Sequence, residues 1–280
     1  MQENSALTDQ GSTEPQRRPA RGRRRILTAI ALLVLLLFAG LGTWQVVRLQ
    51  WKLALIDKVD TRVHAAPREI PLSPTWPAIR AADDEYRHVR VRGHFLFDLT
   101  TPVQAVTVRG SGFWLITPLC RPDGSVVLVN RGFVPGALGG ASGYGVTRAG
   151  PDACAGGDVG GVGGAAVDVS GLLRLTEPKG GFLRLNDAAG GRWYSRDVGA
   201  IATARNLTRV APFFIDVDAR QSGTAGPRDG TPPVGGLTVI SFPNNHLVYA
   251  LTWFALAAMV GAAWYWIARR GPGRAHAPAA

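Results

Sequence analysis

The sequence has few of the residues that build metal and redox centres. Its 280 residues include two cysteines, two methionines and five histidines. The cysteines, Cys120 and Cys154, lie far apart and lack the Cys-x-x-Cys spacing of a copper or zinc site, which argues against such a centre. An oxidising compartment would allow a disulfide between them, but two unpaired thiols explain the sequence at least as well.

Motifs of common enzymes are also missing. The chain contains no Gly-x-Ser-x-Gly elbow, no His-Glu-x-x-His helix and no Walker loop. Its acidic cluster, Asp83-Asp84-Glu85, falls in a proline-flanked polar stretch and is interpreted as solvent-exposed charge. We therefore expect no hydrolase activity and no enzymatic turnover.

The charge is unbalanced, with 31 Lys and Arg against 20 Asp and Glu and a net charge of +11. No nucleic-acid-binding motif accompanies this charge, so we expect no nucleic-acid partner. A basic tail beside an apolar segment explains part of the charge through attraction to anionic lipid, and the lipid bilayer is the expected partner.

Two uncharged apolar runs lie near the ends of the chain, from Ile26 to Val47 and from Leu247 to Ala268. A helix needs about 20 apolar residues to cross the hydrocarbon core of a bilayer, and both runs meet that length. We predict transmembrane helices over 26–48 and 247–268. A cleaved export signal is the alternative for the first run, but the run exceeds the apolar segment of a signal peptide.

Arginines flank both runs on their outer sides, at positions 17, 18, 21, 23, 24 and 25, and at 269, 270 and 274. Cytoplasmic flanks are rich in Lys and Arg, so both termini are predicted to be cytoplasmic. The disordered basic tail would then cover 1–25 and the second tail 269–280. Residues 52–245 would form one domain outside the cytoplasm.

The middle domain is predicted to be rich in β-strands. Apolar Val89, Val91, Phe95 and Phe97 alternate with polar residues, which is typical of a half-buried strand. Further strands are expected over 103–108, 113–119, 126–134, 171–177, 182–185 and 213–217, with a short helix over 198–204. Close spacing favours a mainly antiparallel, barrel- or sandwich-like sheet. Twelve of the 29 residues over 136–164 are glycine, and we interpret this segment as a flexible insertion.

His246 stands at the start of the second apolar run, where a histidine is a functional candidate. Tyr249 and Trp253 follow three and seven residues later on the same helical face, which would offer flat surfaces to a porphyrin. Interfacial anchoring explains the same three residues and is favoured by the residues alone. Asn244 and Asn245 are expected to cap the helix. On the first helix, Arg48 could pair with an anionic group such as a haem propionate or serve as an anchor.

Several segments together resemble the surfeit locus protein 1 family. They are Gly42–Arg48, Gly93–Phe95, Gly112–Pro118, Val127–Pro135, Leu173-Arg174 with Glu177, Trp193–Asp197, Pro212–Asp216 and Asn244–Phe254. Their order, together with the two terminal apolar runs, carries the resemblance over residues 40–256. The glycine-rich insertion departs from the compact pattern of the family.

The resemblance implies a bacterial cell-membrane assembly factor for haem-copper cytochrome c oxidase. Such a factor would receive haem a from haem A synthase and help to place it in oxidase subunit I. It implies that His246 is an axial ligand of the haem iron. Trp44, Gln45 and Arg48 match the first-helix motif, and Trp44 and Arg48 are further candidates for haem contact. Asn130, Arg131 and Gly132 match the signature of the domain and are expected to form a structural turn.

Two other hypotheses stay open. A scaffold that docks on subunit I without touching haem would need the same helices and the same domain. A membrane enzyme that modifies lipid or haem is the weakest of the three, because two helices enclose little reaction volume and no acid–base constellation is seen. Haem that co-purifies with the protein would separate a carrier from a scaffold.

Overall fold

The computed structural model describes residues 20–136, 147–150, 153–154, 165–181, 183–221, 232–240 and 242–270. Most of the predicted N-terminal tail, the glycine-rich insertion and the C-terminal tail fall outside these residues. The chain divides into two units, which are described separately below. The first comprises residues 1–54 and 243–280, and the second comprises residues 55–242.

The helices are α1 (Ala20–His64), α2 (Ala81–Asp84), α3 (Val198–Ala204) and α4 (His246–Arg269), with 3₁₀ turns η1 (Ser73–Ala78), η2 (Phe97–Leu99) and η4 (Ala219–Gln221). The strands are β1 (Arg68–Glu69), β2 (His88–Phe95), β3 (Thr101–Thr107), β4 (Gly110–Cys120), β5 (Val126–Pro135), β6 (Val167–Leu175) and β7 (Val210–Val217). The short helix expected over 198–204 is confirmed as α3.

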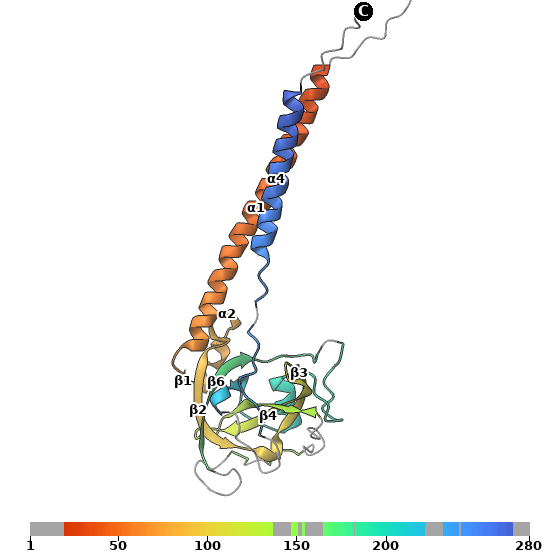
Figure 1. Ribbon diagram of the computed structural model, residues 1–280. Coiled ribbons are helices and arrows are strands. Elements are labelled where there is room, and N and C mark those ends of the chain that lie inside the picture. Colours follow the sequence, from red (N-terminus) through yellow and green to blue (C-terminus); the bar gives the residue numbers. More distant parts are fainter. Residues whose placement is uncertain are drawn as a thin grey trace, which may run out of the picture. The chain divides into compact units, whose positions relative to one another are not determined.

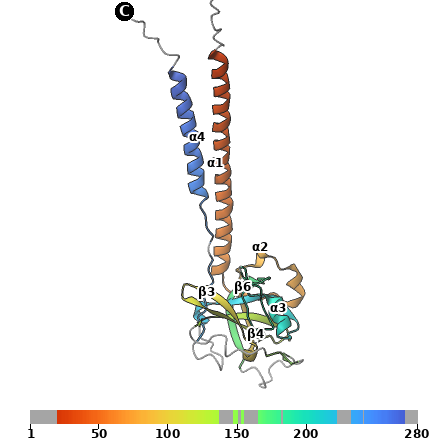
Figure 2. The same ribbon diagram turned by 90° about the vertical axis from the view of Figure 1, so that its right-hand side faces the viewer.

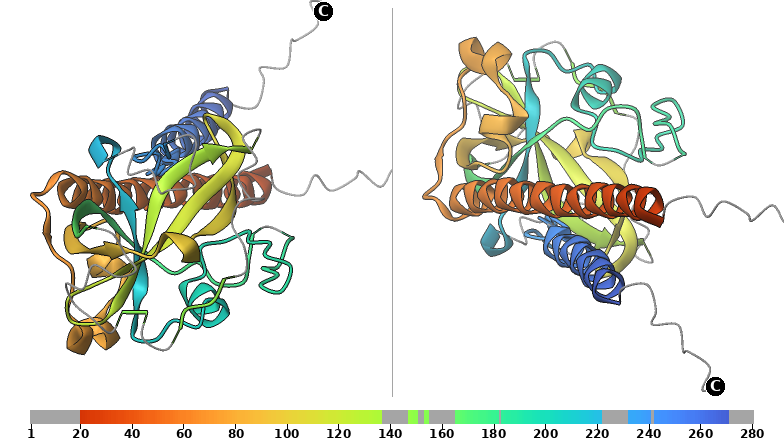
Figure 3. Two further views of the ribbon diagram at one scale, coloured as in Figure 1. Left: turned by 90° about the horizontal axis from the view of Figure 1, so that it is seen from below. Right: turned by 90° about the horizontal axis from the view of Figure 1, so that it is seen from above.

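The first unit is a pair of long helices. The first 35 residues of α1, Ala20 to Ala54, and all of α4 lie side by side in the three orientations of Figures 1, 2 and 3. In the described part of the chain, α1 and α4 are the two helices long and apolar enough to cross a membrane. Most of their large apolar side chains are exposed, including Leu33, Leu36, Val248 and Leu251. α1 extends beyond the predicted span of 26–48 at both ends, from Ala20 to His64.

The second unit is a barrel-like sheet of mainly antiparallel strands, as expected. The strands are ordered β1-β2-β6-β7-β5-β4-β3, and an additional pairing of β2 with β4 closes a ring of β2, β6, β7, β5 and β4. The β1–β2 and β5–β7 pairs are parallel, and the other pairs are antiparallel. Figure 2 shows α3 beside these strands.

The ring closes because β4 changes partner along its length. Its first part pairs with β3, through registers such as Thr101 with Ile116, and its end pairs with β2, where His94 lies opposite Cys120. A glycine is needed at this junction, because a Cβ on Gly93 would lie 2.2 Å from the carbonyl oxygen of Cys120. This close contact explains why the segment Gly93–Phe95, one of those that resemble the family, begins with a glycine.

The sheet is buried on two sides. Inside the ring, Val127, Val129, Phe213 and Ile215 belong to one apolar core. The alternate residues Leu128 and Phe214 point the other way, into a second core formed with the residues Val103, Ile116, Trp193, Val198 and Ile201. Because α3 and its neighbours cover the outer face, β5 and β7 are apolar on both faces, whereas β2 keeps the predicted alternation.

Two sequence-based predictions about this unit were wrong. Residues 183–185 do not form a strand, because Leu183 has a positive φ of 61° and only an isolated bridge joins Gly181 to Arg184; residue 182 lies outside the described residues. The segment Asn130–Gly132 is not a turn but lies inside β5. β4 stays paired with β5 on both sides of this segment, whereas the register of β7 ends at the pair of Asn130 with Asp216.

Candidate functional site

The side chains of Gln45 and His246 meet between the two long helices. Gln45 lies on α1, and His246 is the first residue of α4. The amide oxygen Oε1 of Gln45 is 2.8 Å from Nδ1 of the imidazole. Gln45 is buried, with an exposed fraction of 9%, although it belongs to an otherwise apolar stretch of helix.

This contact is one of a series along the antiparallel pair of α1 and α4. Phe38 packs on Trp253 with ring centroids 5.6 Å apart, and farther along Nε1 of Trp264 donates to Oγ1 of Thr28 at 3.2 Å. With Leu35, whose Cδ1 would lie 3.4 Å from a Cβ on Gly261, the contacting positions on α1 are 28, 35, 38, 42 and 45. They are separated by seven, three, four and three residues, which is the spacing of a helix–helix seam. At Gly42, a Cβ would lie 2.7 Å from the Phe254 ring, so the missing side chain lets the helices approach.

The geometry at His246 selects one tautomer of the ring. An amide oxygen can only accept a hydrogen bond, so Nδ1 carries the proton and donates it. In the neutral ring with its proton on Nδ1, Nε2 holds a lone pair, and this is the form of imidazole that coordinates metals. Among the residues that the structure describes, none makes a hydrogen bond with Nε2. The arrangement therefore presents one nitrogen ligand.

The other predicted site residues divide into two groups. Trp253 faces α1 through its contact with Phe38. Trp44 and Tyr249 point outward, with exposed fractions of 57% and 54%. Arg48 is also exposed, and its guanidinium lies 4.3 Å from the centre of the Trp51 ring. The structure thus brings His246 and Trp253 to the α1-facing side of α4 and leaves the remaining candidates on the outer surface of the pair.

The predicted capping of α4 is only partly as expected. Asn245 occupies the N-cap position, but its side chain makes no capping hydrogen bond. The side-chain oxygen of Asn244 is buried and has no hydrogen-bond partner among the described residues. Neither asparagine side chain therefore satisfies the backbone N–H groups of the first turn.

Gln45 was not among the predicted site residues. The sequence had placed it only in the first-helix motif of the family. A stronger signal was present, because an amide three residues after Gly42, on the same side of an apolar helix, must find a partner where water is absent. Its partner lies 201 positions away in the sequence, so no local pattern could name it.

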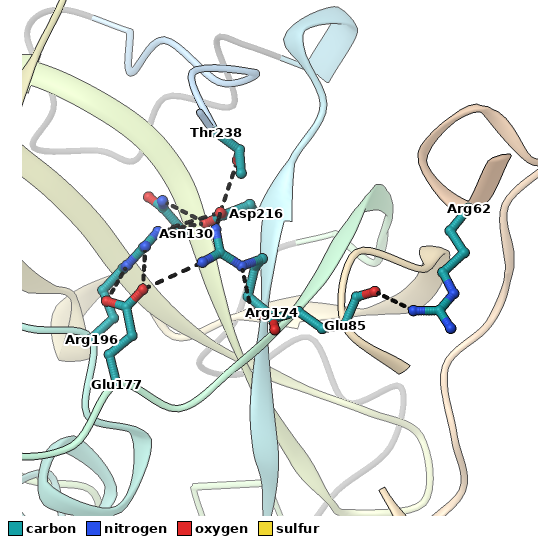
Figure 4. Close-up of polar contacts among 8 residues, drawn as sticks. All are labelled: Arg62, Glu85, Asn130, Arg174, Glu177, Arg196, Asp216 and Thr238. Carbon is teal, nitrogen blue, oxygen red and sulfur yellow. Dashed lines mark hydrogen bonds and ion pairs between the residues drawn. The ribbon is translucent and has the colours of Figure 1, made fainter. Parts of the chain in front are cut away.

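A second group of polar residues lies in the sheet domain, around the buried carboxylate of Asp216 (Figure 4). Asp216 accepts hydrogen bonds from Asn130 at 2.8 Å and from Thr238 at 2.8 Å. Arg174 and Arg196 also donate to it, at 3.2 and 3.1 Å. Most of the segments that carried the family resemblance in this domain therefore converge on one carboxylate.

The two guanidinium groups of this cluster are paired with three carboxylates. Glu177 binds Arg196, and Glu85 lies 3.5 Å from Arg174. Burial would lower the pKa of Arg196, but the charge of Asp216 and the bonds with Glu177 raise it above its ordinary value. Both guanidinium groups are engaged by carboxylates of the cluster, so we interpret it as a structural lock. It joins β5, β6 and β7 to the segment that contains Thr238.

The structure pairs the two cysteines. Cys120, at the end of β4, forms a disulfide with Cys154, and their Cα atoms are 5.5 Å apart. The sequence had left this pairing open. The bond links the closed edge of the barrel to residues 153–154, which follow the first part of the glycine-rich insertion.

No group of three or more His, Cys, Asp or Glu side chains in the described part of the chain is arranged to hold a bare metal ion. A porphyrin differs from a bare ion because it supplies four nitrogens of its own and requires an axial ligand from the protein. The donor available at His246 is of the kind that a porphyrin iron takes.

Comparison with known proteins places the chain in a family. The profile described as the SURF1 family matches residues 32–258. Surfeit locus protein 1 from mouse is 35% identical over 242 residues, covering 81% of this chain and 70% of the mouse protein. The human protein of the same name is 33% identical over 253 residues, covering 84% of this chain and 75% of its own length. The chain therefore belongs to the SURF1 family, whose members are known as cytochrome c oxidase assembly factors.

Proposed function

We propose that this protein is a membrane-anchored assembly factor that binds haem a through His246 and assists its insertion into subunit I of cytochrome c oxidase. The observation that carries the proposal is the Gln45–His246 contact of 2.8 Å, which leaves Nε2 available in a family of oxidase assembly factors. The protein acts on its cargo without catalytic turnover.

In this proposal α1 and α4 cross a bacterial cell membrane and both termini are cytoplasmic. The support is the uncharged length of the two helices, their exposed apolar side chains and the arginines that flank them. The Cys120–Cys154 disulfide supports an oxidising location for the sheet domain. A reporter inserted in the Pro122–Gly124 turn would test this orientation, and a cytoplasmic signal there would contradict it.

Haem a is the cargo of the protein in this proposal. His246 supplies an imidazole at the end of α4 that precedes the apolar run, where the membrane meets the outer compartment in this topology. Trp253, Tyr249 and Trp44 offer flat aromatic surfaces nearby on the helices, and the exposed cation of Arg48 suits a propionate. Haem A synthase would deliver the cargo, and subunit I would receive it.

A scaffold that stabilises an oxidase assembly intermediate without haem is the second candidate. The exposed apolar side chains along α1 and α4 favour it, because such surfaces also suit the helices of a protein partner. This candidate requires no free ligand at His246. The two functions therefore predict different consequences of a substitution at this residue.

The deciding experiment is a pyridine haemochrome assay on detergent-purified protein co-expressed with haem A synthase. We expect haem a in the wild type and in His94→Ala, a control in the sheet domain, and its loss in His246→Ala. Assembled oxidase should fall in the same variant while the protein stays in the membrane. No haem in the wild type would contradict the carrier function and favour the scaffold.

A further inference from the structure

Gln45 acts on the only side chain that the proposed function assigns to iron. We infer that Gln45 is a positioning residue, which holds the proton of His246 on Nδ1 and leaves Nε2 as the ligand atom. The inference rests on the proposed haem-binding function and adds a residue and an atom to it. Gln45 would set the position of the ring proton of His246 in the haem-free protein, before haem binds.

The first step is the proton. A neutral imidazole has one N–H donor and one acceptor nitrogen, and the partner of either nitrogen decides which is which. The amide oxygen of Gln45 lies 2.8 Å from Nδ1, so this nitrogen is the donor. The opposite orientation of the amide would place its NH₂ group there and move the proton to Nε2, which would then be unable to bind iron.

The second step is the strength of this preference. Gln45 is buried between the helices, where little water competes for its amide. A hydrogen bond in such surroundings holds the tautomer and the ring plane more firmly than an exposed bond. Histidines that bind metals commonly donate their other N–H to an oxygen acceptor, and such acceptors orient the ring and raise its basicity.

The third step is the placement of the two residues. One level farther into the helix pair, Phe38 packs on Trp253, and the Phe254 ring fits against Gly42. These contacts set the register of the helices at the level of Gln45 and His246. The imidazole is therefore aligned by packing as well as by its hydrogen bond.

The chemical nature of the group that accepts the Nδ1–H hydrogen bond also affects how readily haem is released. A carboxylate acceptor would draw the Nδ1 proton more strongly and make Nε2 a stronger donor to iron. A neutral amide orients the ring with less of this effect, which suits a protein that must give up its haem. Gln45→Glu should therefore bind haem more tightly and deliver less of it to the oxidase.

The first test uses the haem-free protein. Full-length protein labelled with ¹⁵N-histidine, in detergent micelles, reports which ring nitrogen carries the proton, and His246→Gln identifies the signal. We expect the Nδ1–H tautomer in the wild type and a mixture of tautomers in Gln45→Leu. A wild-type signal from the Nε2–H tautomer would overturn the inference, whatever the protein does with haem.

The second test is a haem titration of the same variants. Gln45→Leu should weaken binding by about 10- to 100-fold, the usual loss when the partner of a ligand is removed. Gln50→Leu, an exposed glutamine five residues farther along α1, is the matched control and should bind as the wild type does. In Gln45→Glu the Raman iron–histidine stretch of the ferrous complex should rise.

The outcomes separate the two proposals. Equal haem affinity in the wild type and Gln45→Leu, with an unshifted stretch in Gln45→Glu, would overturn the role of Gln45 and leave the haem function standing. No haem binding by the wild type, with the Nδ1–H tautomer present, would instead overturn the haem function and with it the ligand role of Nε2.

Discussion

His88 and Asp218 are joined by a hydrogen bond of 2.8 Å between Nε2 of the imidazole and Oδ2 of the carboxylate. The other ring nitrogen, Nδ1, lies 2.7 Å from the carbonyl oxygen of Ala65. Both nitrogens thus face acceptors, and only the protonated imidazolium can donate to both. The side chain of His88 is partly buried in this arrangement.

The stability of the sheet domain should depend on this histidine. Burial alone would lower the pKa of His88, but its bonds to Asp218 and Ala65 and the charge of Asp218 raise it above the ordinary value of 6.5. A raised pKa stabilises the folded state fully at pH values below the unfolded pKa. That stabilisation is lost as pH rises through the folded pKa. The free energy of unfolding of the full chain should therefore fall above about pH 6.5.

Denaturant titrations at a series of pH values would measure this fall. His88→Gln should flatten the profile in that range, and Asp218→Asn should shift it to lower pH. A profile for His88→Gln that matches the wild type would show that another group causes the dependence.

Asp216 should be the most costly single carboxylate to remove from the sheet domain. Its side chain is 4% exposed, and its loss would leave the guanidinium groups of Arg174 and Arg196 without their shared counter-charge. Breaking a buried ion pair by removing one partner costs about 3–5 kcal/mol. Chemical denaturation monitored by tryptophan fluorescence should show that Asp216→Ala lowers the free energy of unfolding by an amount of that order.

The matched control is Glu69→Ala, which removes an ion pair with Arg90 on the surface. Exposed pairs contribute about 0–1 kcal/mol, so this variant should unfold nearly as the wild type does. Equal losses in the two variants would mean that the Asp216 cluster is not a structural lock.

The disulfide should protect both cysteines and stabilise the domain. Cys120 and Cys154 are 34 residues apart, and closing a loop of that size typically stabilises a protein by about 2–4 kcal/mol. Neither thiol should react with a maleimide in protein purified from membranes until a reductant is added. Labelling of unreduced, unfolded protein would contradict the pairing, and Cys120→Ser with Cys154→Ser should lower the unfolding free energy.

The close approach of the helices at Gly42 gives a fourth prediction. Gly42→Leu would place side-chain atoms where the Phe254 ring lies, and overpacking of this kind costs about 1–3 kcal/mol. Oxidative cross-linking between Phe38→Cys and Trp253→Cys should fall in this background and recover when Phe254→Ala is added.

Gly40→Leu is the control for this series, because a Cβ on Gly40 would meet nothing within 4 Å. Cross-linking in Gly40→Leu should match the parent. If Gly40→Leu lowers the yield as much as Gly42→Leu does, the loss reflects poor membrane insertion and not helix packing.

Local patterns were sufficient for the elements that depend on local physics. Uncharged runs of about 20 residues are apolar on every face, so 26–47 and 247–268 could be identified as long helices. The alternation of Val89 and Val91 with arginines identified β2, because side chains alternate between the two faces of a strand. The short helix at 198–204 was also predicted. The family could also be identified from the sequence, because the order of the motifs along the chain is visible without the structure.

The barrel was harder to predict in detail. The parallel β5–β7 pair and the ring closed by β2 and β4 join segments that lie far apart in the chain. Residues 182–185 looked like a strand from composition, but Leu183 adopts a left-handed conformation. The segment Asn130–Gly132 looked like a turn, but it supplies the Asn130 side chain to Asp216.

The partners of the polar residues were decided by tertiary structure alone. Gln45 and His246 are separated by 201 positions, and Asn130 and Asp216 by 86. Hydrogen bonds of this kind are set by the register of packed helices and strands, which no local periodicity encodes. The types of helix and strand could therefore be read from apolar patterning, whereas the tautomer of His246 and the lock around Asp216 arise only when burial forces distant polar groups to satisfy one another.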